Sequence, residues 1–92
     1  MESDVSVRLA GELDLSNVSS LRAKLGAIDG PAVVDLSEVT YLDSAALNEL
    51  ALLRRRVGTV ALVVASANVR RTLEIVGFGT SFRIVASRDE LG

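Results

Sequence analysis

The chain has 92 residues, 49% of them apolar and 24% charged, with a formal net charge of −2, which fits one domain over residues 1–92 with a packed core. It has no cysteine, no histidine and few aromatic residues (one Tyr, two Phe), which excludes disulfides, thiolate nucleophiles, histidine bases, the usual zinc sites and base-stacking nucleic-acid surfaces. Without a run of about 18 apolar residues or a basic leader, the sequence predicts neither a membrane span nor a signal peptide, so a cytoplasmic protein is expected.

The first part of the chain is predicted to form a strand and then a helix. Residues 5–9 alternate apolar and polar side chains, as a half-exposed strand does, and residues 11–14 leave that strand. Ser16 or Asn17 is expected to cap a helix that ends at residues 29–31, where Gly and Pro adjoin. The apolar residues of this helix keep helical spacing and are Val18, Leu21, Leu25 and Ile28.

Two apolar runs rich in β-branched residues, 32–36 and 59–65, fit strands that are covered on both faces. A loop and then a helix over about residues 44–57 are predicted between them. Ser66 is expected to cap the next helix, and Gly77 is a natural stop after it. The inward residues of that helix are predicted to be Val69, Leu73 and Val76.

Residues 82–86 are predicted to form the last strand, and residues 87–91 the first turn of a final helix. The order βαβαβαβ predicts an α/β fold with a four-to-five-stranded, mainly parallel sheet and packed helices, while periodicity leaves the strand order open. Binding features collect at the carboxyl ends of such strands. Two acid-bearing connections leave strands at that edge, namely residues 12–14 and the loop before Ser44.

The stretch VTYLDSAALNEL (residues 39–50) places an acid and a hydroxyl side by side where a loop becomes a helix. Asp43 and Ser44 are both ordinary helix-capping residues, which is one interpretation. The other is that Ser44 is a switch, because a phosphate there would lie at a helix N-terminus and add about −1.5 to −2 charge beside Asp43. At about 100° per residue, the outward row of this helix is predicted to be Ser44, Asn48, Leu52 and Arg55, and its inward row Ala46, Leu50, Leu53 and Val57, with Leu47 at the margin.

Several segments, taken in order, resemble the STAS domain of bacterial anti-sigma factor antagonists. They are GELD at residues 11–14, DLSEV at residues 35–39 and LDSAAL at residues 42–47. Residues 67–78 and 82–84 look like the third helix and the last strand of that family. The resemblance therefore covers nearly the whole chain.

The resemblance implies a phosphorylation switch. In such proteins the serine matching Ser44 is phosphorylated by a partner anti-sigma factor that is itself an ATP-dependent serine kinase. The unmodified form binds this partner and frees a sigma factor, the phosphorylated form releases the partner, and a phosphatase resets the cycle. The chain would then be a kinase substrate in transcription regulation and stress response, with no enzyme activity and no cofactor of its own. The expected partner-binding residues are Glu12, Asp14, Asp43, Asn48, Leu52 and Arg55.

The chain departs from the family pattern in two places. The family usually has Asp-Ser-Ser/Thr-Gly-Leu, whereas here Ala45 and Ala46 follow Ser44, which removes a hydroxyl and adds methyl groups where a partner would approach. The family's first N-terminal strand is also missing or shortened. An uncovered sheet edge of that kind is able to pair with a second copy, so a homodimer is possible.

Three other interpretations remain open. STAS domains also bind the ATPases of lipid-transport systems, so the chain would be an accessory subunit unrelated to sigma factors. A small phosphohydrolase would use an aspartate such as Asp35 or Asp43. The run Arg54, Arg55 and Arg56 suggests a nucleic-acid or membrane contact, although positive charge in a last helical turn also complements the helix dipole.

Overall fold

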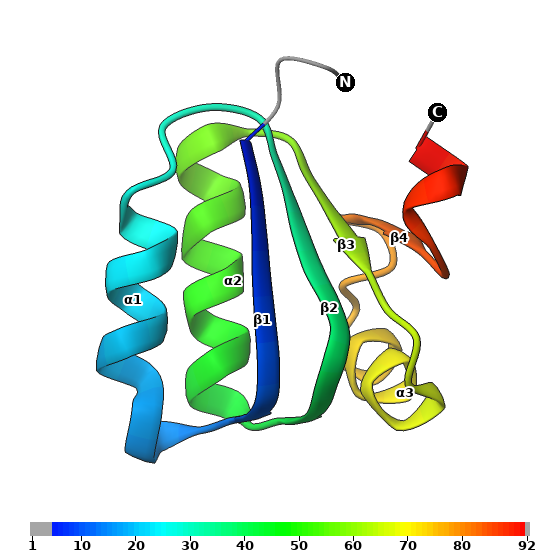
Figure 1. Cartoon of the computed structure of the whole chain (residues 1–92), viewed down its shortest axis with the longest axis horizontal. Helices are drawn as coiled ribbons and strands as arrows, with labels where there is room; N and C mark the ends of the chain where they lie inside the picture. Colours follow the sequence, from blue (N-terminus) through cyan, green and yellow to red (C-terminus); the bar gives the residue numbers. More distant parts are fainter. Residues whose placement is uncertain (1–4, 92) are drawn as a thin grey trace.

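The computed structural model describes residues 5–91, in which four strands form one sheet with helices packed around it (Figure 1). The strands are β1 (Val5–Leu13), β2 (Ala32–Leu42), β3 (Val60–Val63) and β4 (Arg83–Val85). The helices are α1 (Val18–Gly26), α2 (Ser44–Val57) and α3 (Ala67–Ile75), with the short 3-10 helices η1 (Leu15–Asn17) and η2 (Arg88–Leu91). Neighbouring strands run parallel in the order β1-β2-β3-β4, which confirms the predicted parallel α/β fold and supplies the strand order.

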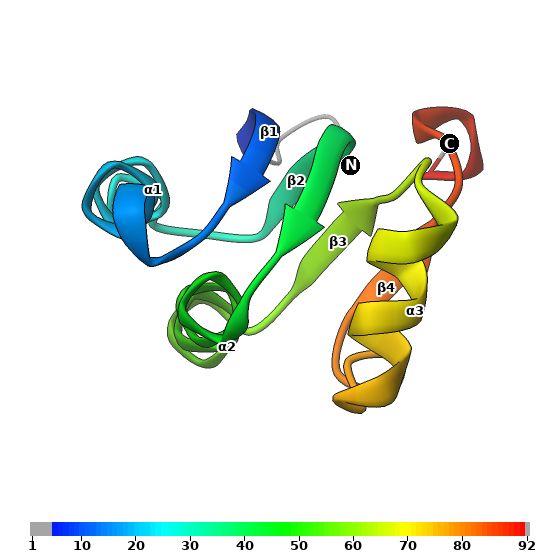
Figure 2. The same ribbon diagram turned by 90° about the horizontal axis from the view of Figure 1, so that it is seen from below.

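The sheet separates a large core from a small one. Helices α1 and α2 lie side by side against one face, and Figure 2 shows η2 on the opposite side of the sheet. Alternate residues of a strand point to opposite faces. Val34 therefore joins the large core under α1 and α2, whereas Val33 joins the small core. Leu91 of η2 packs against this small core, so both faces of the central strands are covered as predicted.

Helix α3 lies across the carboxyl end of the sheet and not along the strands, so Figure 1 views it almost end-on. The side-chain amide of Asn68 donates a hydrogen bond to the carbonyl oxygen of Thr40 in β2, at 3.4 Å. This contact joins α3 to the part of β2 that leads toward Ser44.

The prediction for α3 is confirmed at its start and wrong at its end. The hydroxyl of Ser66 caps the helix by accepting a hydrogen bond from the N–H of Val69, at 3.3 Å. Val69 and Leu73 are buried. Val76, which was predicted to face inward, is 47% exposed because the helix ends before it and the chain turns at Gly77.

Both β1 and β2 are longer than predicted. β1 was expected to end before Gly11 but continues to Leu13, because two register irregularities and a φ of 79° at Gly11 let the strand bend and stay paired. The same pairing extends β2 beyond Leu36 to Leu42, so the prediction of a loop between residue 36 and the helix at Ser44 is wrong. β3 and β4 are slightly shorter than predicted, and residues 88–91 form a 3-10 helix in place of an α-helical turn.

Asn17 is the N-cap residue of α1, as predicted, but its side chain makes no capping hydrogen bond there. The side-chain cap lies one short segment earlier, at η1, where the carboxylate of Asp14 accepts a hydrogen bond from the N–H of Ser16 at 2.9 Å. The Asn17 side chain instead reaches back, accepting from the N–H of Asp14 at 3.0 Å and donating to the carbonyl oxygen of Glu12 at 2.7 Å. These bonds fold residues 12–17 into a closed turn that leads into α1.

The bounds predicted for α2 are confirmed. The helix runs from Ser44 to Val57, and Gly58 follows it with a φ of 88°. Its buried residues include the predicted Ala46, Leu50 and Leu53, and also Glu49, which was not predicted; Val57 and Leu47 are half-buried. Within residues 5–91 no helix has the length and apolar character needed to cross a membrane.

Candidate functional site

Ser44 lies at the carboxyl end of β2, as the first residue of α2, and it is exposed. The capping role belongs to its neighbour Asp43, whose Oδ1 accepts a hydrogen bond from the N–H of Ala46 at 3.0 Å. The Ser44 hydroxyl makes no hydrogen bond to any residue of the described range 5–91. The two interpretations of the Asp-Ser pair therefore apply to different residues. Asp43 caps the helix, and Ser44 presents a hydroxyl that bonds to no described residue.

Asp43 also joins the two connections that were predicted to meet at this edge. Its Oδ2 accepts a hydrogen bond from the N–H of Leu15 at 2.9 Å, and its own N–H donates to the carbonyl oxygen of Leu13 at 3.1 Å. One carboxylate therefore binds both the N-terminus of α2 and the start of η1. The turn that carries Glu12 and Asp14 is held beside Ser44 as a result.

The predicted partner-binding residues occupy this edge and the outward row of α2. Glu12 is exposed, and Asp14 and Asp43 are half-buried because both serve as helix caps. The outward row has the geometry that the helical projection predicted, and its exposed residues are Ser44, Asn48, Leu52 and Arg55. Their role in binding stays a prediction.

Two exposed apolar residues near Ser44 were missed by the sequence reasoning. Leu15, whose backbone is bound by Asp43, is 73% exposed, and Tyr41, two residues before Asp43, is 45% exposed. Neither lies in a periodic apolar pattern, so the sequence signal was only their position beside polar turn residues. Aromatic side chains such as tyrosine are enriched at protein interfaces.

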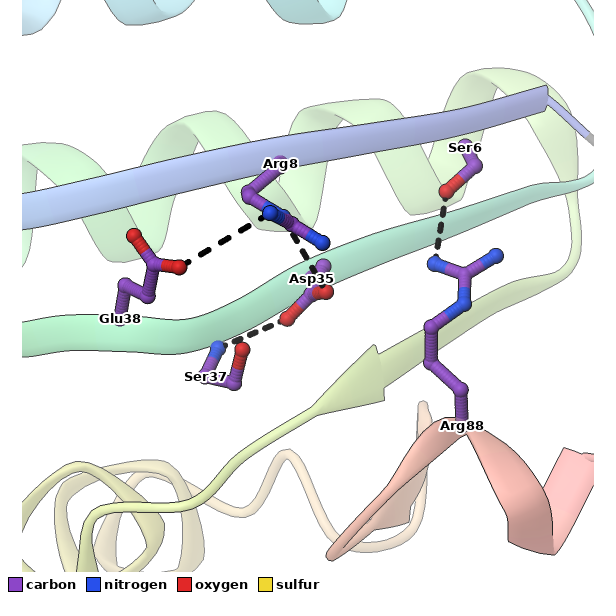
Figure 3. A network of polar contacts seen from close by, with 6 residues as sticks. All are labelled: Ser6, Arg8, Asp35, Ser37, Glu38 and Arg88. Carbon is purple, nitrogen blue, oxygen red and sulfur yellow. Dashed lines mark hydrogen bonds and ion pairs between the residues drawn. The ribbon is translucent and has the colours of Figure 1, made fainter.

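Asp35 belongs to a different place in the fold. It is buried on the sheet face opposite α1 and α2, and Figure 3 shows its polar neighbours. Its carboxylate lies 3.7 Å from Nε of Arg8 and accepts a hydrogen bond from the N–H of Ser37 at 2.9 Å. Burial raises the pKa of Asp35, but the hydrogen bonds of Ser37 and the charges of Arg8 and Arg88 outweigh it, so the pKa lies below its ordinary value.

The Asp35 network stabilises the sheet and the segment that covers it. Arg8 also lies 3.8 Å from Glu38, and Arg88 of η2 donates to the hydroxyl of Ser6 at 2.8 Å (Figure 3). Asp43 follows Asp35 by eight residues of mostly extended chain, on the order of 25 Å at about 3.3 Å per residue. The two aspartates of the phosphohydrolase interpretation therefore do not share a site.

The three consecutive arginines at the end of α2 have separate roles. Arg54 donates from Nε to the carbonyl oxygen of Ser81 at 2.8 Å, and Arg56 donates to the carbonyl oxygens of Leu25, at 2.9 Å, and Ile28. Arg55 is exposed. Two of the three arginines thus hold neighbouring backbone in addition to complementing the helix dipole. Across the described part of the chain, no cluster of three or more carboxylates has the geometry of a metal site.

Comparison with known proteins identifies the family. The family model "Mlab, STAS domain" matches residues 2–86. The anti-sigma-F factor antagonist RsfB of Mycobacterium tuberculosis, matched in two strains, is 33% identical over 86 residues, which cover 86% of this chain and 70% of RsfB.

Two solved structures have the same fold. The anti-sigma factor antagonist SpoIIAA in its unphosphorylated form matches with a TM-score of 0.67 at 21% identity, over 92% of this chain and 81% of SpoIIAA. The Bacillus cell fate determinant SpoIIAA in its phosphorylated form matches with a TM-score of 0.65 at 21% identity, over 94% of this chain and 86% of SpoIIAA. The chain therefore belongs to the STAS domain family, and it is a homologue of an anti-sigma factor antagonist.

Proposed function

We propose that this protein is an anti-sigma factor antagonist whose binding to its partner is switched off by phosphorylation of Ser44. The single observation that carries the proposal is that the Ser44 hydroxyl is exposed and unbonded within the described residues, while the adjacent Asp43 caps α2. Here the fold does not depend on the hydroxyl, so a phosphate changes the surface and leaves the scaffold intact.

The electrostatics favour a switch of this kind. A phosphate on Ser44 would lie at the N-terminus of a 14-residue helix, where unpaired N–H groups and the dipole stabilise negative charge. It would add about −1.5 to −2 charge next to the Asp43 carboxylate. Modification would therefore be tolerated by the helix and would repel an acidic surface that docks there.

The alanine pair after Ser44 is compatible with docking. Ala46, at the position where the family usually has glycine, is fully buried, so its methyl group points into the core and adds no bulk for a partner. Ala45 is half-buried. Only the lost hydroxyl at residue 45 changes the surface that a kinase would meet.

The proposed partner is an anti-sigma factor with serine kinase activity, and a phosphatase would reverse the modification. The docking surface comprises Ser44 and Asp43, the turn with Glu12 and Asp14, and the outward row of α2 with Asn48, Leu52 and Arg55. Unmodified, the protein would bind the anti-sigma factor and release a sigma factor.

The test begins with the intact mass of the protein after incubation with candidate anti-sigma factor kinases and ATP. One added phosphate that maps to Ser44, and is absent from Ser44→Ala, is expected. Partner affinity is then measured for the native chain, Ser44→Ala and Ser44→Asp. Ser44→Ala should bind in the presence of ATP without being released, and Ser44→Asp should bind weakly. Equal affinities for all three would refute the switch.

A second candidate function is an accessory subunit that binds the ATPase of a lipid-transport system. Ala45 favours it, because the hydroxyl residue that usually follows the family's serine is absent beside Ser44. Co-purification separates the two functions. A transporter ATPase as partner supports the second function, and a serine-kinase anti-sigma factor supports the first.

A further inference from the structure

The two helices on the large face of the sheet leave a groove between them. The groove has a volume of about 210 Å³, and its lining includes the buried Leu25 and the exposed Gly26 of α1 and the buried Leu53 of α2. Leu52, which is 46% exposed, lines the same groove. Because Leu52 also belongs to the outward row of α2, the groove continues the surface that leads to Ser44.

Gly26 lines the groove, and the space around the position of its missing side chain is open. A Cβ atom built on Gly26 would meet no atom within 4 Å, apart from the backbone of its own helix and its chain neighbours. Its backbone has no positive φ, so a side chain is sterically acceptable there. The missing side chain therefore leaves space at the surface and is not required by the packing of α1 against α2.

At one end of the groove an ion pair joins the two helices. Glu49, only 7% exposed, accepts hydrogen bonds from Nε and Nη2 of Arg22 at 3.3 and 3.2 Å. The pair links α1 to α2, and its two charges balance each other at this end.

The other end of the groove is positively charged. Arg56 lines the groove and bonds only to carbonyl oxygens, so no carboxylate in the described range lies within ion-pair distance of it. Arg55, beside it on the outward row, also forms no ion pair with a described residue. This end therefore presents two arginines that form no ion pair with a described carboxylate, on a chain whose formal net charge is −2.

We propose that the α1–α2 groove receives an amphipathic, acidic helix of the protein partner. Its apolar residues would pack on Leu25, Leu52 and Leu53, and its carboxylates would face Arg55 and Arg56. A third helix packs readily into the furrow between two parallel-lying helices, and charge complementarity selects an acidic one. The inference rests on the proposed function in one respect, namely that the partner binds through the α2 surface.

The absence of cysteine allows a test at a single position. Gly26→Cys is alkylated either with iodoacetamide, which adds a neutral group, or with iodoacetate, which adds a carboxylate of almost the same size. Ser87→Cys, at an exposed site after β4 on the other side of the sheet, is the matched control. The probe is the purified anti-sigma factor kinase, or the purified transporter ATPase if that is the protein that co-purifies, and affinity is measured by isothermal titration calorimetry.

The carboxymethyl form of Gly26→Cys is expected to bind about tenfold more weakly than its neutral counterpart, because its negative charge would repel the acidic partner helix. A bulky maleimide at the same cysteine should abolish binding, and the labels at Ser87→Cys should change nothing. Thermal unfolding of each labelled protein confirms that it is folded.

Equal affinity of the neutral, charged and bulky forms of Gly26→Cys would overturn the groove proposal, even if Ser44→Asp still weakens binding. Loss of binding at Gly26→Cys with no effect of Ser44→Asp would support the groove and refute the switch. If the native chain is a dimer by light scattering and the bulky label makes it monomeric, a second copy occupies the groove and the proposal fails.

Discussion

The carboxylate of Asp43 accepts a hydrogen bond from the backbone N–H of Leu15, a residue 28 positions earlier in the chain, at 2.9 Å. The other oxygen of the same carboxylate caps α2 through Ala46. Two loops that leave neighbouring strands are thereby fixed to each other directly beside Ser44. The position of the proposed switch is set by this one side chain.

Asp43→Ala should therefore lower the free energy of unfolding by about 2 kcal/mol, because it removes a helix cap and a second hydrogen bond to a charged group. Urea denaturation at pH 7 measures the change. Ser44→Ala is the matched control and should change stability by no more than about 0.5 kcal/mol, since its hydroxyl is unbonded and exposed. A larger loss in Ser44→Ala than in Asp43→Ala would show that the capping roles are reversed.

The bounds of α2 were predictable at about residues 44–57 because two signals agree there. An Asp-Ser start and helical apolar spacing through Val57 both act locally, within one or two turns. The outward row of the helix follows from the same periodicity. That part of the candidate site was predictable.

The rest of the site depends on contacts between distant segments. In the second half of β2, buried and exposed side chains do not alternate regularly, because bulges in the pairing with β1 shift the register. Thr40 and Tyr41 were therefore assigned to a loop. Topology predicted that the turn at Asp14 and the loop before Ser44 share an edge. That Asp43 binds Leu15 follows only from three-dimensional geometry. The burial of Glu49 was not predicted, because α1 covers a side of α2 that carries polar residues in the sequence.

The lowered pKa of Asp35 should make the stability of the fold depend on pH. Because its pKa in the folded protein lies below the ordinary value, the unfolded chain binds the proton more readily. The stabilisation is therefore fully present above the unfolded pKa of about 4 and is lost as pH falls through the lower folded value. Asp35→Asn should be less stable than the native chain by about 1–2 kcal/mol at pH 7, and this difference should shrink at pH 3.

Urea denaturation at the two pH values tests this expectation, with Glu38→Gln as control. Glu38 contacts the same arginine, but its side chain is 59% exposed, so its ion pair should contribute less than about 0.5 kcal/mol at either pH. A difference for Asp35→Asn that stays constant from pH 7 to pH 3 would contradict the role assigned to its ionised form.

Removing one residue of the Arg22–Glu49 pair should destabilise the fold more than removing both. Arg22→Met leaves the carboxylate of Glu49 buried without its partner and should cost about 1–2 kcal/mol, less than for a fully buried pair because Arg22 is 64% exposed. The double variant Arg22→Met, Glu49→Met should recover most of that loss, since the charge is removed as well. Thermal unfolding of the single and double variants measures the coupling. Additive effects would show that the pair does not act as a unit.

The exposed residues Leu15 and Tyr41 are expected to affect binding of the partner and not the stability of the fold. Leu15→Ser should leave the free energy of unfolding within about 0.5 kcal/mol of native, because the side chain is 73% exposed and its backbone N–H still reaches Asp43. It should weaken binding of the proposed anti-sigma factor partner by about tenfold or more, since a leucine beside the proposed phosphorylation site would be buried by the docked partner. Val76→Ser is the control, being an exposed apolar residue (47%) at the end of α3. Calorimetric titration with the anti-sigma factor kinase proposed as the partner measures both variants. Equal weakening by Leu15→Ser and Val76→Ser would mean that the docking surface is centred elsewhere than on the Asp43–Leu15 contact.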